Sequence, residues 1–244
     1  MLIPKVDFSP LSKEGNWNIV EWAWHQTGGP LPLHDGTVKL FPQLSESPEG
    51  GKKYSDARLD EDREKILEAC TRFQTAWDKV GDEYMRRLSE VLQIEWPEDC
   101  ARISGRVGVL PVCPRYIQER AFDISWWYST EQCMTVTAHE SCHYLYFEKW
   151  KTLVPSWEWD DFENPSLIWQ LSEMAIDPIL GRKQIGELFT RPFPAYDSFY
   201  RVSLGGKPLM ETLREHFSGP DMGKNIMSAY EWLSANREEL MSHF

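Results

Sequence analysis

The clearest hydrophobic pattern in this chain runs from residue 57 to residue 94. Apolar side chains recur there at intervals of three and four, which is the spacing of one face of an α-helix. The pattern predicts one long helix or two helices in line, with Ser55 or Asp56 as the N-terminal cap, an interruption at Gly81 and an end before Pro97. The apolar positions are Ile66, Cys70, Phe73, Trp77, Val80, Tyr84, Leu88 and Val91.

The segments on either side have shorter patterns that are broken by glycine and proline. Residues 1–56 predict short strands and loops, with a hairpin around His34–Gly36, and are expected to form an irregular segment that packs on the rest of the chain. Residues 101–129 predict three short strands, because runs of β-branched and aromatic residues are separated there by prolines. These strands cover 103–110, 115–117 and 121–129.

The pattern beyond residue 130 is helical and predicts four helices. Asn164 and Pro165 are suited to the start of the second helix, and Gly181 is suited to its end. The whole chain is therefore predicted to be α+β, mostly helical, with a small mixed sheet. The four helices cover 131–150, 165–180, about 207–217 and about 222–241.

The first of these helices contains the string His139-Glu140-Ser141-Cys142-His143, which reads H-E-x-x-H. Residues four apart lie about 40° apart on a helix, so both histidines can direct a ring nitrogen at one ion. Glu140 lies beside that face and can reach a water bound to the metal. The string therefore predicts a metal site with a carboxylate base, the zinc-and-base signature of metallopeptidases.

A catalytic zinc usually has three protein ligands, so one more must come from outside the motif. The helix at 165–180 offers Glu173 and Asp177, which share one face of an otherwise apolar helix. Two buried acids are costly without a cation, so Glu173 is predicted to bind the metal and Asp177 to orient a ligand histidine. Alternatively, Glu173 forms a buried ion pair with an arginine such as Arg106 or Arg182. The rival third ligands are Asp160, Asp161 and Glu163.

Taken together, the two motifs resemble the gluzincin metallopeptidases, the thermolysin-like group. Its members carry H-E-x-x-H on one helix and E-x-x-x-D on a following helix. The order of a long helix, a small sheet, the motif helix and the glutamate helix over residues 57–182 is also similar, although the connection from His143 to Glu173 is longer than in thermolysin. The resemblance implies a zincin-like domain over residues 57–244, with the irregular segment 1–56 packed on it.

The resemblance also implies roles for individual residues. His139, His143 and Glu173 would bind zinc, and Asp177 would steady one ligand histidine. Glu140 would act as the general base that takes a proton from the activated water and passes it to the leaving amine. An oxyanion stabiliser is expected further along the chain. Its candidates are Tyr196, Tyr200, Arg201 and His216.

Substrate contacts are predicted just before the motif helix. By the same resemblance, the strand at 121–129 would be the sheet edge that pairs with an extended peptide. The chain has twelve tryptophans, most of which are expected to fill the core. Trp126 and Trp127 are the best candidates for the aromatic wall of a substrate cleft, because they lie next to the motif helix in the sequence.

Composition narrows the class of protein. A formal net charge of −12 argues against a nucleic-acid partner. The five cysteines are scattered and form no C-x-x-C pair, which argues against a disulfide framework. The N-terminus lacks the apolar region of a secretory signal, and no apolar stretch is long enough to span a membrane. We therefore expect a cytoplasmic protein.

The sequence thus predicts a zinc-dependent metallopeptidase that hydrolyses peptide bonds in a peptide or protein substrate. The alternative is a catalytically inactive zinc-binding regulator or interaction module on a peptidase scaffold. A third possibility is an intracellular regulatory protease with one partner protein as its substrate, which the absence of an export signal favours.

Overall fold

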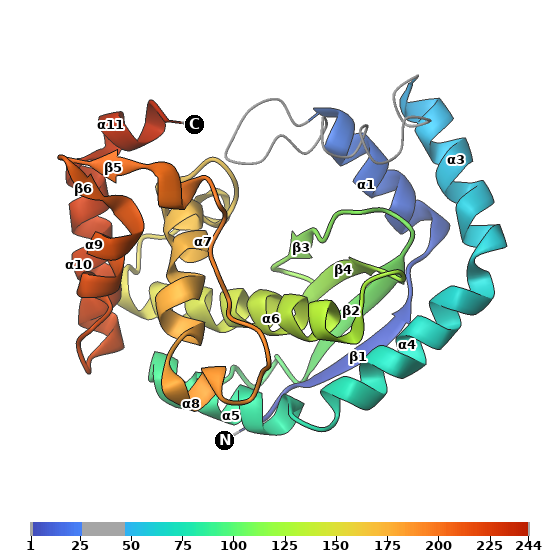
Figure 1. Cartoon of the computed structure of the whole chain (residues 1–244), viewed down its shortest axis with the longest axis horizontal. Coiled ribbons are helices and arrows are strands. Elements are labelled where there is room, and N and C mark those ends of the chain that lie inside the picture. Colours follow the sequence, from blue (N-terminus) through green and yellow to red (C-terminus); the bar gives the residue numbers. More distant parts are fainter. Residues whose placement is uncertain (1, 26–46, 244) are drawn as a thin grey trace. The chain divides into compact units, whose positions relative to one another are not determined.

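The computed structural model describes residues 2–25 and 47–243 and is drawn in Figure 1. The fold is mixed α+β, 58% helical, with a small mixed sheet, as the sequence predicts. The chain divides into two compact units. The sheet unit comprises Pro4–Asp82 and Asp99–Glu140, and the helical unit comprises Met1–Ile3, Glu83–Glu98 and Ser141–Phe244.

The sheet unit is built on four strands in the order β1-β2-β4-β3. Strands β1 (Lys5–Pro10), β2 (Arg102–Gly108) and β4 (Ala121–Ser125) are parallel, and β3 (Arg115–Tyr116) pairs antiparallel with β4. All five residues of β4 are buried, as is typical of a parallel strand covered on both faces. The predicted strands at 103–110, 115–117 and 121–129 are therefore confirmed in number and place, but β2 starts and ends earlier than predicted, β3 is one residue shorter, and β4 ends at Ser125, four residues early.

The prediction that the strand at 121–129 is a sheet edge is wrong. Strand β4 lies between β2 and β3: β2 pairs along its whole length, and β3 pairs with its first two residues, Ala121 and Phe122. The antiparallel edge is β3, which has only two residues. Pro111 and Pro114 precede β3, and proline cannot donate a ladder hydrogen bond, which keeps this edge short.

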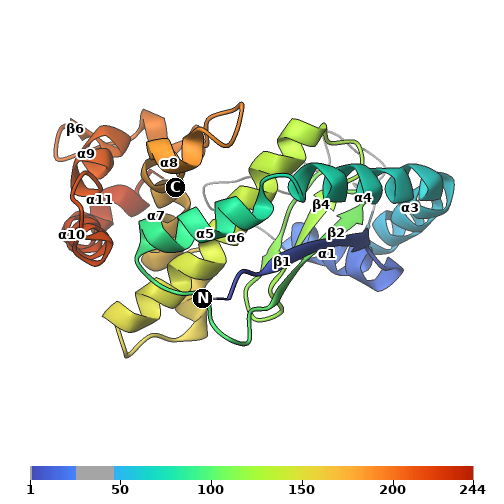
Figure 2. The ribbon, with the colours of Figure 1, turned by 90° about the horizontal axis from the view of Figure 1, so that it is seen from below.

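In its described residues, the sheet unit also contains the helices α1 (Lys13–His25), α3 (Pro48–Glu61) and α4 (Arg63–Trp77). Helix α4 packs along β1, and α1 packs on α3 (Figures 1 and 2). Residues 1–56 were predicted to be short strands and loops, so α1 and the start of α3 correct that prediction, while β1 agrees with it. The predicted hairpin at His34–Gly36 lies outside the described residues.

The predicted cap of the long helix is also corrected. Ser47, not Ser55 or Asp56, caps α3, and its hydroxyl accepts a hydrogen bond from the backbone N–H of Gly50. The helical pattern was hidden because this first turn contains glycines, which have low helix propensity. The predicted interruption is confirmed, because α4 ends at Trp77 and α5 (Gly81–Leu92) starts at Gly81. A Cβ at position 81 would lie 2.4 Å from Nε1 of Trp77, so only glycine fits there.

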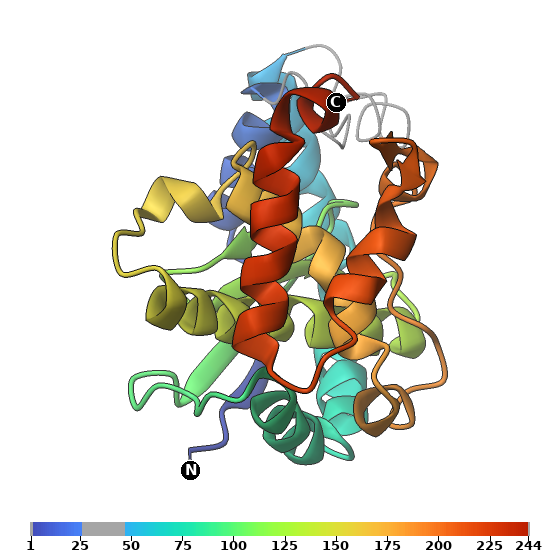
Figure 3. The same ribbon diagram turned by 90° about the vertical axis from the view of Figure 1, so that its left-hand side faces the viewer.

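Helix α6 (Thr130–Leu153) carries the H-E-x-x-H motif and passes from one unit into the other. In the helical unit, α7 (Leu167–Leu180), α9 (Leu209–His216) and α10 (Met222–Ala235) pack against one another (Figure 3). The predicted helix at 222–241 is divided at Asn236, where α10 ends before α11 (Arg237–Met241). The smaller elements are η2 (Trp159–Phe162), α8 (Lys183–Gly186), η3 (Phe199–Arg201), β5 (Ser203–Leu204) and β6 (Lys207–Pro208).

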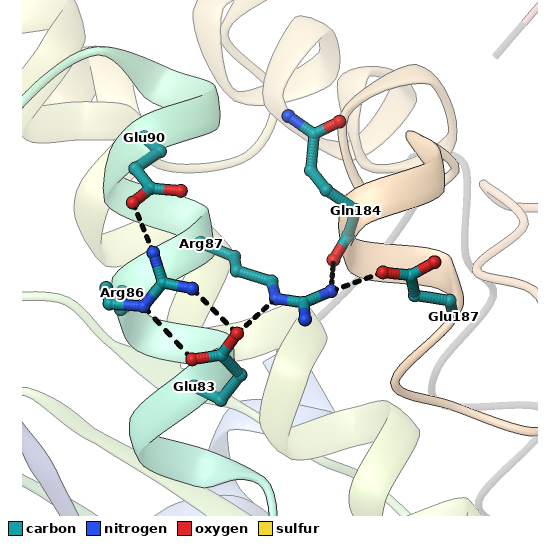
Figure 4. Close-up of polar contacts among 6 residues, drawn as sticks. All are labelled: Glu83, Arg86, Arg87, Glu90, Gln184 and Glu187. Carbon is teal, nitrogen blue, oxygen red and sulfur yellow. Dashed lines mark hydrogen bonds and ion pairs between the residues drawn. The ribbon is translucent and has the colours of Figure 1, made fainter.

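A network of charges ties α5 to α8 inside the helical unit (Figure 4). Nη1 of Arg87 donates to the carbonyl of Gln184 at 2.6 Å and to Oε1 of Glu187 at 2.7 Å. Glu83 accepts hydrogen bonds from Arg86 and Arg87, which lower the pKa of its carboxyl to about 2. This network fixes the backbone of α8.

No helix in the described ranges 2–25 and 47–243 is both long enough and apolar enough to cross a membrane.

Candidate metal centre

The motif helix α6 brings its three signature side chains together. His139, Glu140 and His143 each offer one ligand atom, and these atoms all lie within 4.8 Å of one another. His143 and Glu140 are buried, and His139 is half-buried. The ring of His143 stacks on Phe147, one turn further along, with 6.0 Å between the ring centroids. The predicted common face of the two histidines is therefore present in the structure.

Local sequence explains where this helix starts. The hydroxyl of Ser129 accepts from the backbone N–H of Gln132 at 3.1 Å, and the side chain of Gln132 accepts from the N–H of Ser129 at 2.9 Å. This is a reciprocal capping box, and it satisfies two donors that a helix start otherwise leaves without partners. The motif begins three turns later, where α6 is buried.

Helix α7 places a further acid, Glu173, beside the motif histidine His143. Oε2 of Glu173 lies 3.4 Å from Nε2 of His143, and both side chains are almost fully buried. Two ligand atoms that each lie about 2.1 Å from a tetrahedral ion are about 3.4 Å apart. The spacing between the carboxylate and the imidazole thus fits two ligands of one zinc ion. An imidazole nitrogen and a carboxylate oxygen are also donor types that zinc accepts.

The alternative partners of Glu173 make other contacts. Arg106 donates to Asp123 at 2.6 Å, and Arg182 donates to the carbonyls of Phe217 and Gly219. These contacts give both arginines defined structural positions. The ion-pair interpretation of Glu173 therefore gains no support from them.

The rival third ligands lie on or beside the short helix η2. The side chain of Asp161 accepts from the backbone N–H of Glu158 at 2.8 Å and forms part of a capping box. Asp160 and Glu163 are exposed. Glu173, in contrast, is buried and lies 3.4 Å from the motif histidine His143. The geometry therefore favours Glu173.

Sequence reasoning missed one charged neighbour of the motif. Nη1 of Arg115, on the edge strand β3, lies 3.7 Å from Oε2 of Glu140. The two side chains are only 8% and 9% exposed, so this ion pair is largely shielded from water. The sequence carries no signal for the contact, because it depends on how β3 packs against α6.

Asp177 has a different environment from the one predicted. Its carboxylate accepts from Nε of Arg214 at 2.9 Å, from Nη2 of Arg214 at 2.7 Å and from the hydroxyl of Tyr200. The hydroxyl of Tyr200 in turn accepts from the backbone N–H of Ala195 at 3.0 Å. The role of Asp177 as an orienting group for a histidine stays a prediction, and α9 and η3 provide partners that the sequence did not indicate.

The expected oxyanion stabilisers are placed as follows. Burial, with help from Asp177, raises the pKa of Tyr200 to about 12, so its hydroxyl keeps its proton. His216 shares a hydrogen bond with the hydroxyl of Ser228 at 2.8 Å and stacks on Trp232, and burial lowers the pKa of its imidazole. Tyr196 packs on Phe199, and Arg201 lies exposed in η3. The oxyanion roles of Tyr200 and His216 stay predictions.

Trp126 and Trp127 lie in the turn between β4 and α6. Nζ of Lys65 lies 4.9 Å from the centre of the Trp126 ring, and Arg72 donates to the backbone carbonyl of Trp126 at 3.1 Å. Trp127 is 43% exposed and contacts the ring of Tyr128. Trp127 is thus accessible to a ligand, whereas Trp126 is half-buried. Their substrate-binding role stays a prediction.

Comparison with known proteins found no match to this chain among protein-family models, curated proteins or solved structures. The geometry of α6 and α7 therefore carries the functional argument by itself.

Proposed function

We propose that His139, His143 and Glu173 bind one zinc ion and that the protein is a zinc-dependent metallopeptidase of gluzincin type, with a zincin-like fold. The observation that carries the proposal is the 3.4 Å spacing between Glu173 and His143, two buried side chains that belong to different helices. Burial of a carboxylate is costly, and a zinc ion bound to both side chains would offset this cost. The third proposed ligand, His139, belongs to the group on α6 in which the ligand atoms of His139, Glu140 and His143 lie within 4.8 Å of one another.

The reaction that follows from these residues is the hydrolysis of a peptide bond. A bound zinc would act as a Lewis acid towards the scissile carbonyl and lower the pKa of its water towards 7. Glu140 would take the proton of the attacking water and deliver it to the leaving amine. Arg115 lies beside Glu140, and its positive charge stabilises the negative charge of the carboxylate.

A cytoplasmic location forms part of the proposal. None of the five cysteines, all of which lie in the described residues, forms a disulfide, and four of them are buried. Free cysteines are typical of a reducing compartment, whereas secreted proteins commonly pair them.

The test is metal analysis of the purified protein combined with two variants. The wild-type protein should hold about one equivalent of zinc, and His143→Ala should lose it, because two remaining ligands bind zinc weakly. Glu140→Gln should keep the metal and lose hydrolysis of a panel of unfolded proteins and peptides. His216→Ala is the matched histidine control, since His216 contacts Ser228 and Trp232, and it should keep its zinc.

Zinc bound equally by the wild-type protein and by His143→Ala would contradict the proposed site.

A second function has a specific observation in its favour, the ion pair between Arg115 and Glu140. A carboxylate that is held by a buried guanidinium is less free to move towards a water molecule. The alternative is therefore a zinc-binding regulator or interaction module without turnover. Both functions predict bound zinc, so hydrolysis separates them: a zinc-loaded wild-type protein that cleaves nothing in the panel would favour the regulator.

A further inference from the structure

The helical unit contains a cavity of about 490 Å³ at the C-terminal end of α7. Its apolar wall is formed by Leu180, Phe189 and Phe193. Phe189 packs edge-on against Phe193 and Tyr84, with ring centroids 4.9 Å and 5.5 Å apart, so this wall is held by α5. A cavity of this size is in the range that binds small ligands.

The cavity is close to the proposed zinc ligand Glu173. Residues Glu173, Asp177 and Leu180 are spaced by four and then three positions, so they share one face of α7. Asp177 and Leu180 line the cavity. The helix rises 1.5 Å per residue, so the cavity begins about 6 Å along the axis from Glu173, which is about two residues of extended peptide.

Arg214 is held in a fixed orientation at the wall of this cavity. Its Nε and Nη2 both donate to Asp177, whose side chain is 14% exposed. A guanidinium has five N–H donors, and two of them are used by Asp177. The outer N–H groups of Nη1 and Nη2 form a second, end-on pair of donors, and this pair is suited to another carboxylate. The Arg214 side chain is 48% exposed, so a ligand can reach it. Because Asp177 fixes the guanidinium, little side-chain entropy remains to be lost on binding.

The charges of the lining favour an anion. Arg191 and Arg214 are positive and Asp177 is negative, so the formal sum of these three is +1 in a chain whose net charge is −12. A ligand that complements the whole cavity has an apolar side chain and a carboxylate next to each other. The C-terminal residue of a peptide has this combination.

We propose that this cavity binds the C-terminal residue of a peptide substrate, with its carboxylate on Arg214 and its apolar side chain against Leu180, Phe189 and Phe193. This inference rests on the proposed zinc peptidase function and makes the enzyme an exopeptidase that releases one or two residues. In the reaction, the C–N bond breaks, the oxygen of water forms the new bond to the carbonyl carbon, and one proton passes to the amine of the released fragment. No other reactant is needed.

The first experiment measures binding without turnover. The probe is an N-acetylated tetrapeptide that ends in leucine, prepared as the free acid and as the C-terminal amide, and titrated calorimetrically into zinc-loaded Glu140→Gln protein. The free acid should bind about tenfold or more tightly than the amide, because a charge-assisted hydrogen bond is lost in the amide. In Glu140→Gln/Arg214→Gln the ratio of the two affinities, free acid to amide, should fall to about one. Arg214→Lys keeps the charge but not the fork, so its ratio should lie between those of the native arginine and the glutamine variant.

The control is Arg237→Gln, which removes an exposed arginine at the start of α11 that does not line the cavity. It should keep the preference for the free acid. Equal binding of acid and amide to Glu140→Gln protein with native Arg214 would overturn the inference, and this comparison does not depend on whether the Arg214 variants fold.

The second experiment identifies the products of the wild-type enzyme by mass spectrometry. Loss of one or two residues from the C-terminus of the free acid, and at least tenfold slower cleavage of the amide, supports the inference. Internal cleavage at equal rates in both peptides overturns it and leaves the zinc peptidase function intact. If the protein binds no zinc but keeps the Arg214-dependent preference for the free acid, the proposed function fails while the carboxylate site stands.

Discussion

Each unit of this protein contains an acid that is almost fully buried, and the two acids have different partners. In the sheet unit, Asp123 accepts from Nε of Arg106 at 2.6 Å and from the hydroxyl of Tyr116 at 3.0 Å. In the helical unit, Glu173 lies 3.4 Å from Nε2 of His143. Asp123 therefore contacts a permanent cation and a hydroxyl donor, as a structural ion pair does. Glu173 contacts a side chain that is itself a metal ligand type, so the comparison separates a structural acid from a proposed ligand.

The largest difference between the two acids should appear when zinc is removed. We expect chelation to lower the free energy of unfolding by about 4 kcal/mol relative to protein with zinc at a thousandfold excess over its Kd. Glu173→Gln should weaken zinc binding by about a hundredfold or more, beyond the effect of an outer-shell partner. At the same zinc concentration this should reduce the response to about 1.4 kcal/mol or less. The measurements are urea unfolding with and without chelator and a competition titration with a zinc indicator.

The matched control for that experiment is Asp123→Asn, which changes a buried acid in the same isosteric way. It should keep the full response to chelation. If both variants respond like the wild type, Glu173 is not a ligand, and its burial beside His143 has a structural explanation.

The next largest effect should come from the arginine of the sheet unit. Arg106 on β2 is the direct cross-strand neighbour of Asp123 on β4. Replacement by Met leaves the Asp123 carboxylate buried without this cation, which should cost about 3 kcal/mol of stability at pH 8. Urea unfolding of Arg106→Met measures this loss, and zinc content should be unchanged. A loss of zinc in Arg106→Met would mean that the two acids are not separate in function.

A smaller effect should appear in the pH dependence of stability. Burial raises the pKa of Asp123 from 3.8 to about 6, although Arg106 and Tyr116 act in the opposite direction. The folded state therefore binds this proton more tightly than the unfolded state does. Above pH 6 the ionised, buried carboxylate destabilises the fold, and this destabilisation is relieved as the pH falls from about 6 towards 3.8. The predicted gain from this group is up to about 3 kcal/mol in total.

The measurement is urea unfolding of chelator-treated protein between pH 5 and pH 8, where the wild type should become more stable as the pH falls towards 5. Asp123→Asn has no carboxyl at this position, so the rise should be smaller in that variant. An identical pH profile for both proteins would show that Asp123 does not titrate in this range.

The comparison also shows which parts of the molecule a sequence can reveal. The motif on α6 and the glutamate on α7 were predictable because helical periodicity fixes which residues share a face, whatever the rest of the fold does. The strands around Asp123 were predicted from another local signal, runs of β-branched and aromatic residues separated by prolines. Their order was not predicted, because it depends on which strands pair: β1, from the N-terminal segment, pairs with β2, and β3 folds back on β4.

Partners that come from distant elements were equally hidden. The fork of Arg214 on Asp177 joins α9 to α7, and the contact of Arg115 with Glu140 joins β3 to α6. No spacing rule links such positions, since each pair depends on packing between elements. The start of α3 at Pro48 was not predicted either, because the glycines of its first turn have low helix propensity and are typical of a loop.

The smallest expected effect tests whether the position of Glu173 depends on the start of its own helix. The hydroxyl of Ser166 caps α7 by accepting from the backbone N–H of Trp169 at 2.9 Å. Ser166→Ala should reduce stability by about 1 kcal/mol, the usual effect of losing an N-cap. Glu173 lies seven residues further along, about two turns into a helix that is buried on nearly all sides, so fraying of the first turn should not reach it. Zinc affinity should therefore match that of the wild type in the indicator competition. A loss of affinity comparable to that of Glu173→Gln would show instead that the ligand geometry depends on this cap, and the separation between structural and ligand roles in α7 would then be wrong.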